Sequence, residues 1–380
     1  MLISHSKELY APSLRTQHKQ NNTLDYDQNI KASPLIHIVS TRFMQEQHNL
    51  TSLAKARLEL FRSFCLPSIV NQKSQNFIWI IKIDPELDIH IVDEIIKMIK
   101  PFTNFFLIAS NINYDLNLWW GEIESKELFS SKILFGNGEL LKAIYKAAVG
   151  GEKILLETRL DADDGLHRDY LNNIQYSATA QLIPRPAKIA DNSASTENLV
   201  EKIATLNWIY WCAKTYIDWF SGEDEIGKLF NTEPKFCVTP GLTLGIAPGA
   251  DGSKVPRSPH QRLAMVVYFT GDCGAKRKGM CIQKVPQVHI SAIRSRTLTS
   301  AGMAGVNEPY PKSTNDTQTE LWQFTAESFG ISKVDVRSAN AYINKYSSLI
   351  AEENLRGQCT PGHSCKNSTQ MKLKKVVSER

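Results

Sequence analysis

Positions 161–164 hold three aspartates and one alanine, and they are the sharpest chemical feature of this sequence. Side chains alternate along an extended chain, so Asp161 and Asp163 can point the same way while Ala162 leaves room for a close ligand. Carboxylates crowded in this way repel one another unless a cation neutralises them, and hard divalent ions such as Mg²⁺ and Mn²⁺ prefer oxygen ligands. The run therefore predicts a site for a divalent ion and a phosphate. The alternative is an acidic helix start, capped by Asp163 or Asp164.

An alternation of strands and helices leads up to this acidic run. Short apolar runs predict four buried strands, at residues 35–43, 77–84, 102–109 and 153–160. Helical spacing predicts helices at residues 53–70, where Thr51 or Ser52 is a plausible cap, and at 89–99, 139–149 and 166–176. Strands that alternate with helices of this length imply right-handed crossovers and a mostly parallel sheet. Ligands bind beyond the carboxyl ends of such strands, which is where the acidic run lies.

The second half of the sequence is less regular. Residues 207–220 are dense in aromatic side chains and predict a strand or a hairpin. Trp208, Tyr210 and Trp211 within it either stack on acceptor sugars or pack in the core. Two closing helices are predicted at residues 320–329 and 339–353.

Composition narrows the class of protein. The 380 residues are 42% hydrophobic and 22% charged, values typical of a folded globular chain. No stretch approaches the roughly 18 apolar residues of a membrane helix, and no signal peptide is apparent at the start. The net charge of +5 is partly due to the last residues, so we expect no nucleic-acid partner and no transmembrane segment in this chain.

Seven cysteines in a chain of this length do not form a disulfide-framework pattern. Cys65 is expected to be a small core residue. Cys273 with Cys281, and Cys359 with Cys365, are close enough in sequence to form loop disulfides in an oxidising compartment. We expect a cytoplasmic protein if the chain is complete, and the Golgi lumen is the alternative if an N-terminal anchor is missing.

Three motifs, in order, resemble one known family. They lie at residues 41–43 (Thr41-Arg42-Phe43), 61–79 and 158–164. The family is the "putative rhamnosyltransferase" family of glycosyltransferase-like proteins, and the resemblance spans roughly residues 35–175. It implies an α/β fold of the GT-A type, a Rossmann-like, mostly parallel sheet flanked by helices, with an irregular C-terminal acceptor half. It implies a nucleotide-sugar-binding half at 34–180, followed by an acceptor and metal-completing half at 181–310. The sequence pattern adds the expectation of a flexible segment at 1–33, closing helices at 311–356 and a disordered basic tail at 357–380.

The resemblance also implies roles for individual residues. Asp161 and Asp163 resemble the DxD pair that holds a donor diphosphate through Mn²⁺ or Mg²⁺. His289 is the best-placed candidate for a third metal ligand, although a histidine in an apolar strand is often a core residue. The other expected donor-binding residues are Thr41, Arg42, Asp84, Arg159, Asp164, Arg294, Ser295 and Arg296. Asp84 could instead begin a turn before a proline, and the arginines could form ordinary ion pairs.

The expected reaction moves a sugar from a nucleotide diphosphate sugar to a hydroxyl of a glycan, lipid or small molecule. An inverting enzyme needs a carboxylate base, for which Asp251, Asp272 and the acidic residues at 223–225 are candidates; a retaining enzyme does not. A nucleotidyl- or phosphotransferase that uses the same carboxylates is one alternative, and a non-catalytic glycan-binding relative is another. The sequence contains no GxGxxG, Walker or GxSxG motif, which argues against dehydrogenases, P-loop NTPases and α/β-hydrolases.

Overall fold

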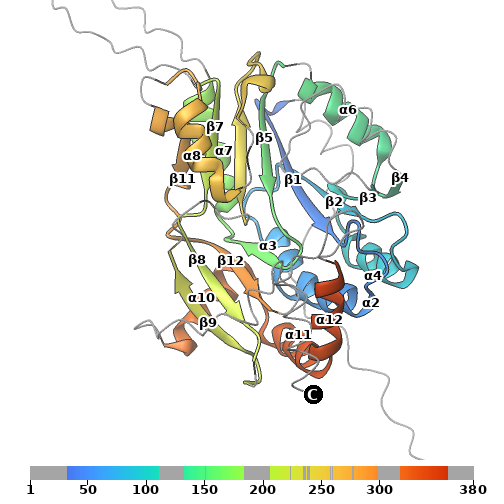
Figure 1. Cartoon of the computed structure of the whole chain (residues 1–380). Coiled ribbons are helices and arrows are strands. Elements are labelled where there is room, and N and C mark those ends of the chain that lie inside the picture. The colour runs from blue at the N-terminus through green and yellow to red at the C-terminus, as the bar shows by residue number, and fades with distance from the viewer. Residues whose placement is uncertain are drawn as a thin grey trace, which may run out of the picture.

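Two β-sheets form the framework of the molecule (Figure 1). The computed structural model describes residues 32–110, 132–149, 151–183, 206–222, 224–233, 237, 240–256, 258, 260–275, 278–297 and 317–357. Within these residues the larger sheet has the strand order β11-β7-β10-β5-β1-β2-β3-β4, and the smaller sheet has the order β6-β12-β8-β9. The predicted α/β class is confirmed, and the large sheet is mixed.

The centre of the large sheet is parallel, as the alternation of strands and helices predicts. Its parallel strands are β1 (Leu35–Phe43), β2 (Ile78–Ile83), β3 (Phe105–Ala109) and β5 (Ile154–Arg159). On one side β4 (Lys132–Phe135) pairs antiparallel with β3. On the other, β10 (Leu242–Ile246) pairs antiparallel with both β5 and β7 (Trp208–Cys212), and β11 (Ile282–Lys284) follows β7 in parallel.

Residues 207–220 form two strands, but not a hairpin. β7 joins the large sheet, whereas β8 (Thr215–Phe220) pairs with β12 (Ile290–Arg296) and β9 (Lys228–Thr232) in the small sheet. The aromatic side chains therefore belong to two different sheets, although they share one hydrophobic core. Trp219 of β8, for example, packs against Phe64 with ring centroids 4.9 Å apart. The tryptophans and Tyr210 are buried, which agrees with the core interpretation.

Side-chain alternation along β1 divides the core into two layers. Ile36 and Ile38 belong to a cluster with the buried residues of α6 (Gly138–Val149). Val39 and Phe43 belong to the larger cluster on the opposite face, which includes α4 (Ile89–Ile99) and α7 (Tyr170–Leu182). A further helix, α8 (His260–Thr270), lies beside β7 (Figure 1).

A buried hydrogen-bond chain crosses the larger of these layers. The side-chain amide of Gln175 donates to Nδ1 of His37 (3.1 Å), so the neutral imidazole carries its proton on Nε2. That nitrogen contacts the hydroxyl of Thr158 at 2.8 Å, which lies 2.7 Å from the hydroxyl of Thr243. Thr243 in turn donates to the carbonyl of Gly241 at 3.0 Å. The chain is consistent in direction only while His37 is uncharged.

The first helical segment is continuous but changes its winding. It consists of α2 (Thr51–Leu60), a π-helical turn (Phe61–Cys65) and α3 (Leu66–Val70). The expected cap at Thr51 or Ser52 is wrong, because neither side chain caps the helix. Instead, the carboxylate of Glu353 accepts a hydrogen bond from the backbone N–H of Leu53 at 2.8 Å. Thus Glu353 accepts one of the N–H groups in the first turn of α2 that have no partner within the helix.

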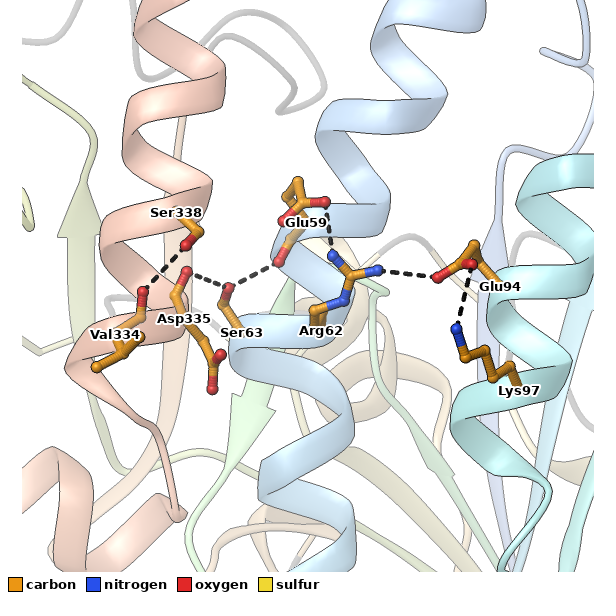
Figure 2. Close-up of polar contacts among 8 residues, drawn as sticks. All are labelled: Glu59, Arg62, Ser63, Glu94, Lys97, Val334, Asp335 and Ser338. Carbon is orange, nitrogen blue, oxygen red and sulfur yellow. Dashed lines mark hydrogen bonds and ion pairs between the residues drawn. The ribbon is translucent and has the colours of Figure 1, made fainter. Parts of the chain in front are cut away.

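Three helices close the described chain, where two were expected. They are α10 (Gln318–Phe329), α11 (Lys333–Lys345) and α12 (Ser347–Gly357), and α11 and α12 pack beside α2 (Figure 1). Figure 2 shows the polar part of this contact. The Ser63 hydroxyl lies 3.0 Å from the carbonyl of Asp335 in α11. On the other side of the first helical segment, Arg62 bridges Glu59 and Glu94 of α4. The C-terminal helices are therefore fixed to the first helix.

The described residues of the second half contain two disulfides. One joins Cys273 and Cys281, the first of the two pairs that the spacing suggested. The other, between Cys212 of β7 and Cys237, was not anticipated. Cys65 is buried and unoxidised, as expected for a core residue, while Cys359 and Cys365 lie outside the described residues. None of the helices in the described ranges has the length and apolar character needed to cross a membrane.

Candidate functional site

The acidic run forms a turn between the two sheets. Asp161 and Asp163 follow β5, and the backbone N–H of Asp164 donates to the carbonyl of Asp161 at 3.1 Å. Asp164 then begins β6 (Asp164–Leu166), which pairs antiparallel with β12. The next helix, α7, starts only at Tyr170, with Asp169 at its N-cap. The interpretation of Asp163 or Asp164 as a helix cap is therefore wrong.

A single residue of β12 holds two of the three carboxylates. The hydroxyl of Ser295 donates to Oδ2 of Asp163 at 3.0 Å, and its backbone N–H donates to Oδ1 of Asp164 at 3.1 Å. Asp164 is buried, whereas the side chain of Asp161 remains 38% exposed with Arg159 Nε 3.9 Å from its Oδ1. The turn therefore presents one open carboxylate beside two that are fixed.

The carboxylates repel one another. Burial, and then the charge of Asp161, raises the pKa of Asp163, against opposing effects of Arg57 and Ser295. Burial, followed by the charges of Asp163 and Asp161, raises the pKa of Asp164 well above its usual value, and Arg294 opposes this. The turn thus holds negative charge at a cost, which a bound cation would lower.

Arg57 of α2 is a site residue that our sequence reasoning missed. Burial lowers the pKa of its guanidinium, and the charges of Asp163 and then Asp161 oppose this, which shows that Arg57 is close to the turn. Nη1 donates to Oε1 of Gln47 at 2.6 Å, in the loop after β1. The available signal was an arginine between the buried residues Ala56 and Leu58 of the predicted helix.

The β12 arginines lie close to charged and polar side chains of the small sheet. Arg294 forms a two-point ion pair with Asp218 of β8 (Nε–Oδ1 2.9 Å and Nη2–Oδ2 3.3 Å). It also donates to the Tyr216 hydroxyl at 3.0 Å and lies over that ring. Arg296 is partly buried, and burial, then the charge of Arg294, lowers its pKa. Arg294 therefore has a protein carboxylate as its first partner.

The residues predicted on the first two strands lie at the carboxyl edge of the sheet. Thr41 is buried and accepts a hydrogen bond from Trp79 Nε1 at 2.9 Å, and Arg42 next to it is half-buried. Asp84 is 2% exposed, and its two carboxylate oxygens each accept a backbone N–H at 2.9 Å, from Glu46 and Glu86. This geometry agrees with the turn interpretation of Asp84.

Three other candidates are not brought to the acidic turn. His289 is exposed, and it precedes Ser295 by six residues along β12, which is about 20 Å. Asp251 caps a short 3₁₀ helix (Gly252–Lys254). This helix lies near the amino end of β5, whereas the acidic turn follows the carboxyl end of that strand. The backbone carbonyl of Asp272 accepts a hydrogen bond from Trp208 Nε1 at the start of β7. Because β7 runs in the same direction as β5, Asp272 lies at the amino edge of the sheet, opposite to the edge of the acidic turn.

The acidic alternatives at 223–225 have partners of their own or fall outside the described residues. Asp224 pairs with Lys228 at 3.2 Å, and Glu225 pairs with Arg337. Glu223 lies outside the described residues. Thus none of the described carboxylates in the predicted set lies at the acidic turn, where a general base would be needed.

The donor set fits a divalent ion that shares its ligands with a substrate. In the part of the chain that the structure describes, no three His, Cys, Asp or Glu side chains form a metal cluster. Mg²⁺ is often held by only one or two carboxylates, with phosphates and water completing its octahedron. Asp161 and Asp163 supply oxygens of this kind at an exposed turn.

A family model matches part of the chain. Residues 50–118 match the model of the family described as "Putative rhamnosyl transferase", a segment that contains the second of the three motifs and Arg57. The chain is also similar to the crystal structure of S. aureus TarS 1–349, with 10% sequence identity over 85% of this chain and 80% of that chain and a TM-score of 0.29. No curated protein matches the chain. The family match gives coarse support for a glycosyltransferase.

Proposed function

We propose that this protein is a metal-dependent glycosyltransferase. It transfers a sugar from a nucleotide diphosphate donor to a hydroxyl of a glycan, lipid or small-molecule acceptor. The acidic turn at the carboxyl end of β5 carries the proposal, because Ser295 fixes two carboxylates and leaves Asp161 open to a ligand. The family match at residues 50–118 supports the glycosyl-transfer chemistry.

Each residue of the turn has a distinct part in this proposal. Asp161 and Asp163 hold the divalent ion, which, when bound, offsets the charge of the diphosphate leaving group. Ser295 fixes the rotamer of Asp163 through its hydroxyl and that of Asp164 through its backbone N–H. Arg57 contributes a fixed positive charge on the α2 side of the turn. Positive charge on one side reduces carboxylate repulsion before any ligand arrives.

Thermal unfolding with nucleoside diphosphates tests the proposal. The native protein should gain about 3–5 °C with the preferred diphosphate and Mn²⁺ at 100 times its dissociation constant. The double variant Asp161→Asn/Asp163→Asn should not respond, whereas Asp251→Asn, a matched change far from the turn, should respond fully. An equal response in the double variant would contradict the proposal. A preference for nucleoside triphosphates would favour a nucleotidyl- or phosphotransferase, and a response to glycans alone would favour a binding protein.

Gly165 is expected to be essential for the position of the turn. A Cβ at this residue of β6 would lie 2.9 Å from Cγ2 of Ile293 and 3.1 Å from the carbonyl oxygen of Phe64, in the π-helical turn. Gly165→Ala should therefore lower the free energy of unfolding by about 1–3 kcal/mol, measured by urea denaturation. In the control Gly138→Ala, the new methyl group meets only the flexible end of Ile133, at 3.2 Å. Equal stabilities of the two variants would show that β6 has more room than the structure indicates.

A further inference from the structure

A polar cavity lies apart from the acidic turn. It has a volume of 460 Å³ and is lined by residues from the start of α7, the segment before β12, and α10. The lining includes His167, Asn172, Asn173, His289 and Phe324. His167 in the lining follows Asp164 by three residues, about 10 Å along the extended chain, and His289 precedes Ser295 by six residues, about 20 Å.

Asn173 is the strongest indication that this cavity receives a ligand. It is 8% exposed, and its side-chain amide has no hydrogen-bond partner among the residues that the structure describes. Its amide atoms are not among the fully buried side-chain atoms that lack a partner in the described residues, so they can be reached from the cavity. A ligand hydroxyl in the cavity would satisfy both ends of the amide.

The lining suits an uncharged, hydroxyl-rich ligand. Asp169 is already paired with Lys73 at 2.6 Å, and the described lining residues include no lysine or arginine, although Lys73 and Arg168 are close to His167. Nδ1 of His167 accepts the backbone N–H of Asp169 at 3.1 Å, so the neutral ring offers Nε2–H as a donor. Amides and imidazoles can both donate to and accept from sugar hydroxyls.

An aromatic ring and a strained turn complete the cavity. Phe324 of α10 lies next to His167, with ring centroids 6.1 Å apart. An aromatic face packs well against the C–H face of a pyranose ring. In the segment before β12, the lining residue Gln287 has a φ of 64°. Residues other than glycine adopt this left-handed backbone rarely, and such residues are concentrated at functional sites.

We propose that this cavity is a carbohydrate-binding site that takes one neutral saccharide unit, between the amide of Asn173 and the ring of Phe324. It is separate from the acidic turn, and it needs neither a nucleotide nor a metal ion. In an acceptor glycan of several units it would hold a sugar distant from the point of transfer. That last role rests on the proposed function, whereas saccharide binding itself does not.

Saturation-transfer NMR with a panel of neutral methyl glycosides tests the site. The panel comprises the glucoside, galactoside, mannoside, rhamnoside and N-acetylglucosaminide, without nucleotide or metal. At least one should bind the native protein, and Asn173→Leu, Phe324→Ala and His289→Ala should each weaken binding by about tenfold or more. Gln323→Ala on α10 and Tyr176→Ala on α7 are matched controls outside the lining and should bind normally. Circular dichroism identifies any variant that fails to fold, and exposed His289 gives a variant with little risk of this.

The same measurement on Asp161→Asn/Asp163→Asn separates this site from the proposed enzyme. Retained glycoside binding in that variant is the expected result, even if nucleotide binding is absent. Binding that the three cavity variants do not change would overturn the assignment, as would a panel in which no glycoside binds the native protein. Either result leaves the proposal for the acidic turn untouched, because that proposal is tested with nucleotides.

Discussion

Replacing Asp163 by asparagine should reduce sugar transfer by roughly 10²–10³-fold and should not lower the melting temperature of the ligand-free protein. The loss follows from removing a negative oxygen that would hold the metal ion. Stability is kept because the neutral amide can still accept the Ser295 hydroxyl, and because it removes a buried charge next to Asp161. Transfer is measured with the donor whose nucleotide stabilises the native protein most, and stability by calorimetry.

The combination of the two readouts separates a functional carboxylate from a structural one. Asp88→Asn is the control, since Asp88 caps α4 by accepting the N–H of His90 and asparagine caps equally well. It should leave both activity and stability unchanged. A variant at Asp163 that is less stable but fully active would show that the carboxylate serves only to fold the turn.

The second large effect is expected in the pH dependence of stability. Burial lowers the pKa of His37 to about 3, whereas an unfolded histidine has a pKa of about 6.5. Below pH 6.5 the unfolded chain therefore binds a proton that the folded protein excludes, so stability present above pH 6.5 is lost as the pH falls towards 3. The linkage amounts to roughly 4–5 kcal/mol over this range. A protonated Nδ1 could also no longer accept the hydrogen bond from the side-chain amide of Gln175.

Urea unfolding between pH 7 and pH 4 measures this effect. His37→Gln should show a smaller decline than the native protein, although it is less stable at pH 7 because the hydrogen-bond chain is altered. His90→Gln, an exposed change on α4, should follow the native curve. Parallel curves for His37→Gln and the native protein would mean that folding does not lower the pKa of His37.

The local patterns of the sequence predict the first half of the fold well. The helix Ile89–Ile99 has the predicted bounds, because its apolar residues recur at helical spacing and Pro101 limits it. The four parallel strands are likewise marked by continuous apolar runs. Each of these signals lies within a dozen neighbouring residues.

What sequence reasoning missed depends on contacts between distant segments. Nothing near residues 213–214 indicates that the chain changes sheets there, because β8 is stabilised by β12, more than 70 residues later. The cap of α2 was missed for the same reason, since Glu353 is 300 residues from Leu53.

The candidate site shows the same division. The acidic run and its place after β5 could be predicted, but the contacts of Ser295 and Arg57 with it could not. Ser295 was expected to contact a diphosphate, and in the structure its hydroxyl binds Asp163.

The bond between Ser295 and Asp164 spans 131 residues and has a consequence for biosynthesis. While the chain is being translated, β1, β2, β3 and β5 are available long before β12, so the parallel strands can associate first. The acidic turn and β6 then remain unpaired until β12 has left the ribosome. A product released before residue 290 would expose an unpaired strand edge beside carboxylates that lack the hydrogen bonds of Ser295, and such edges promote association with other chains. Premature termination in this gene should therefore yield aggregates rather than a smaller folded protein.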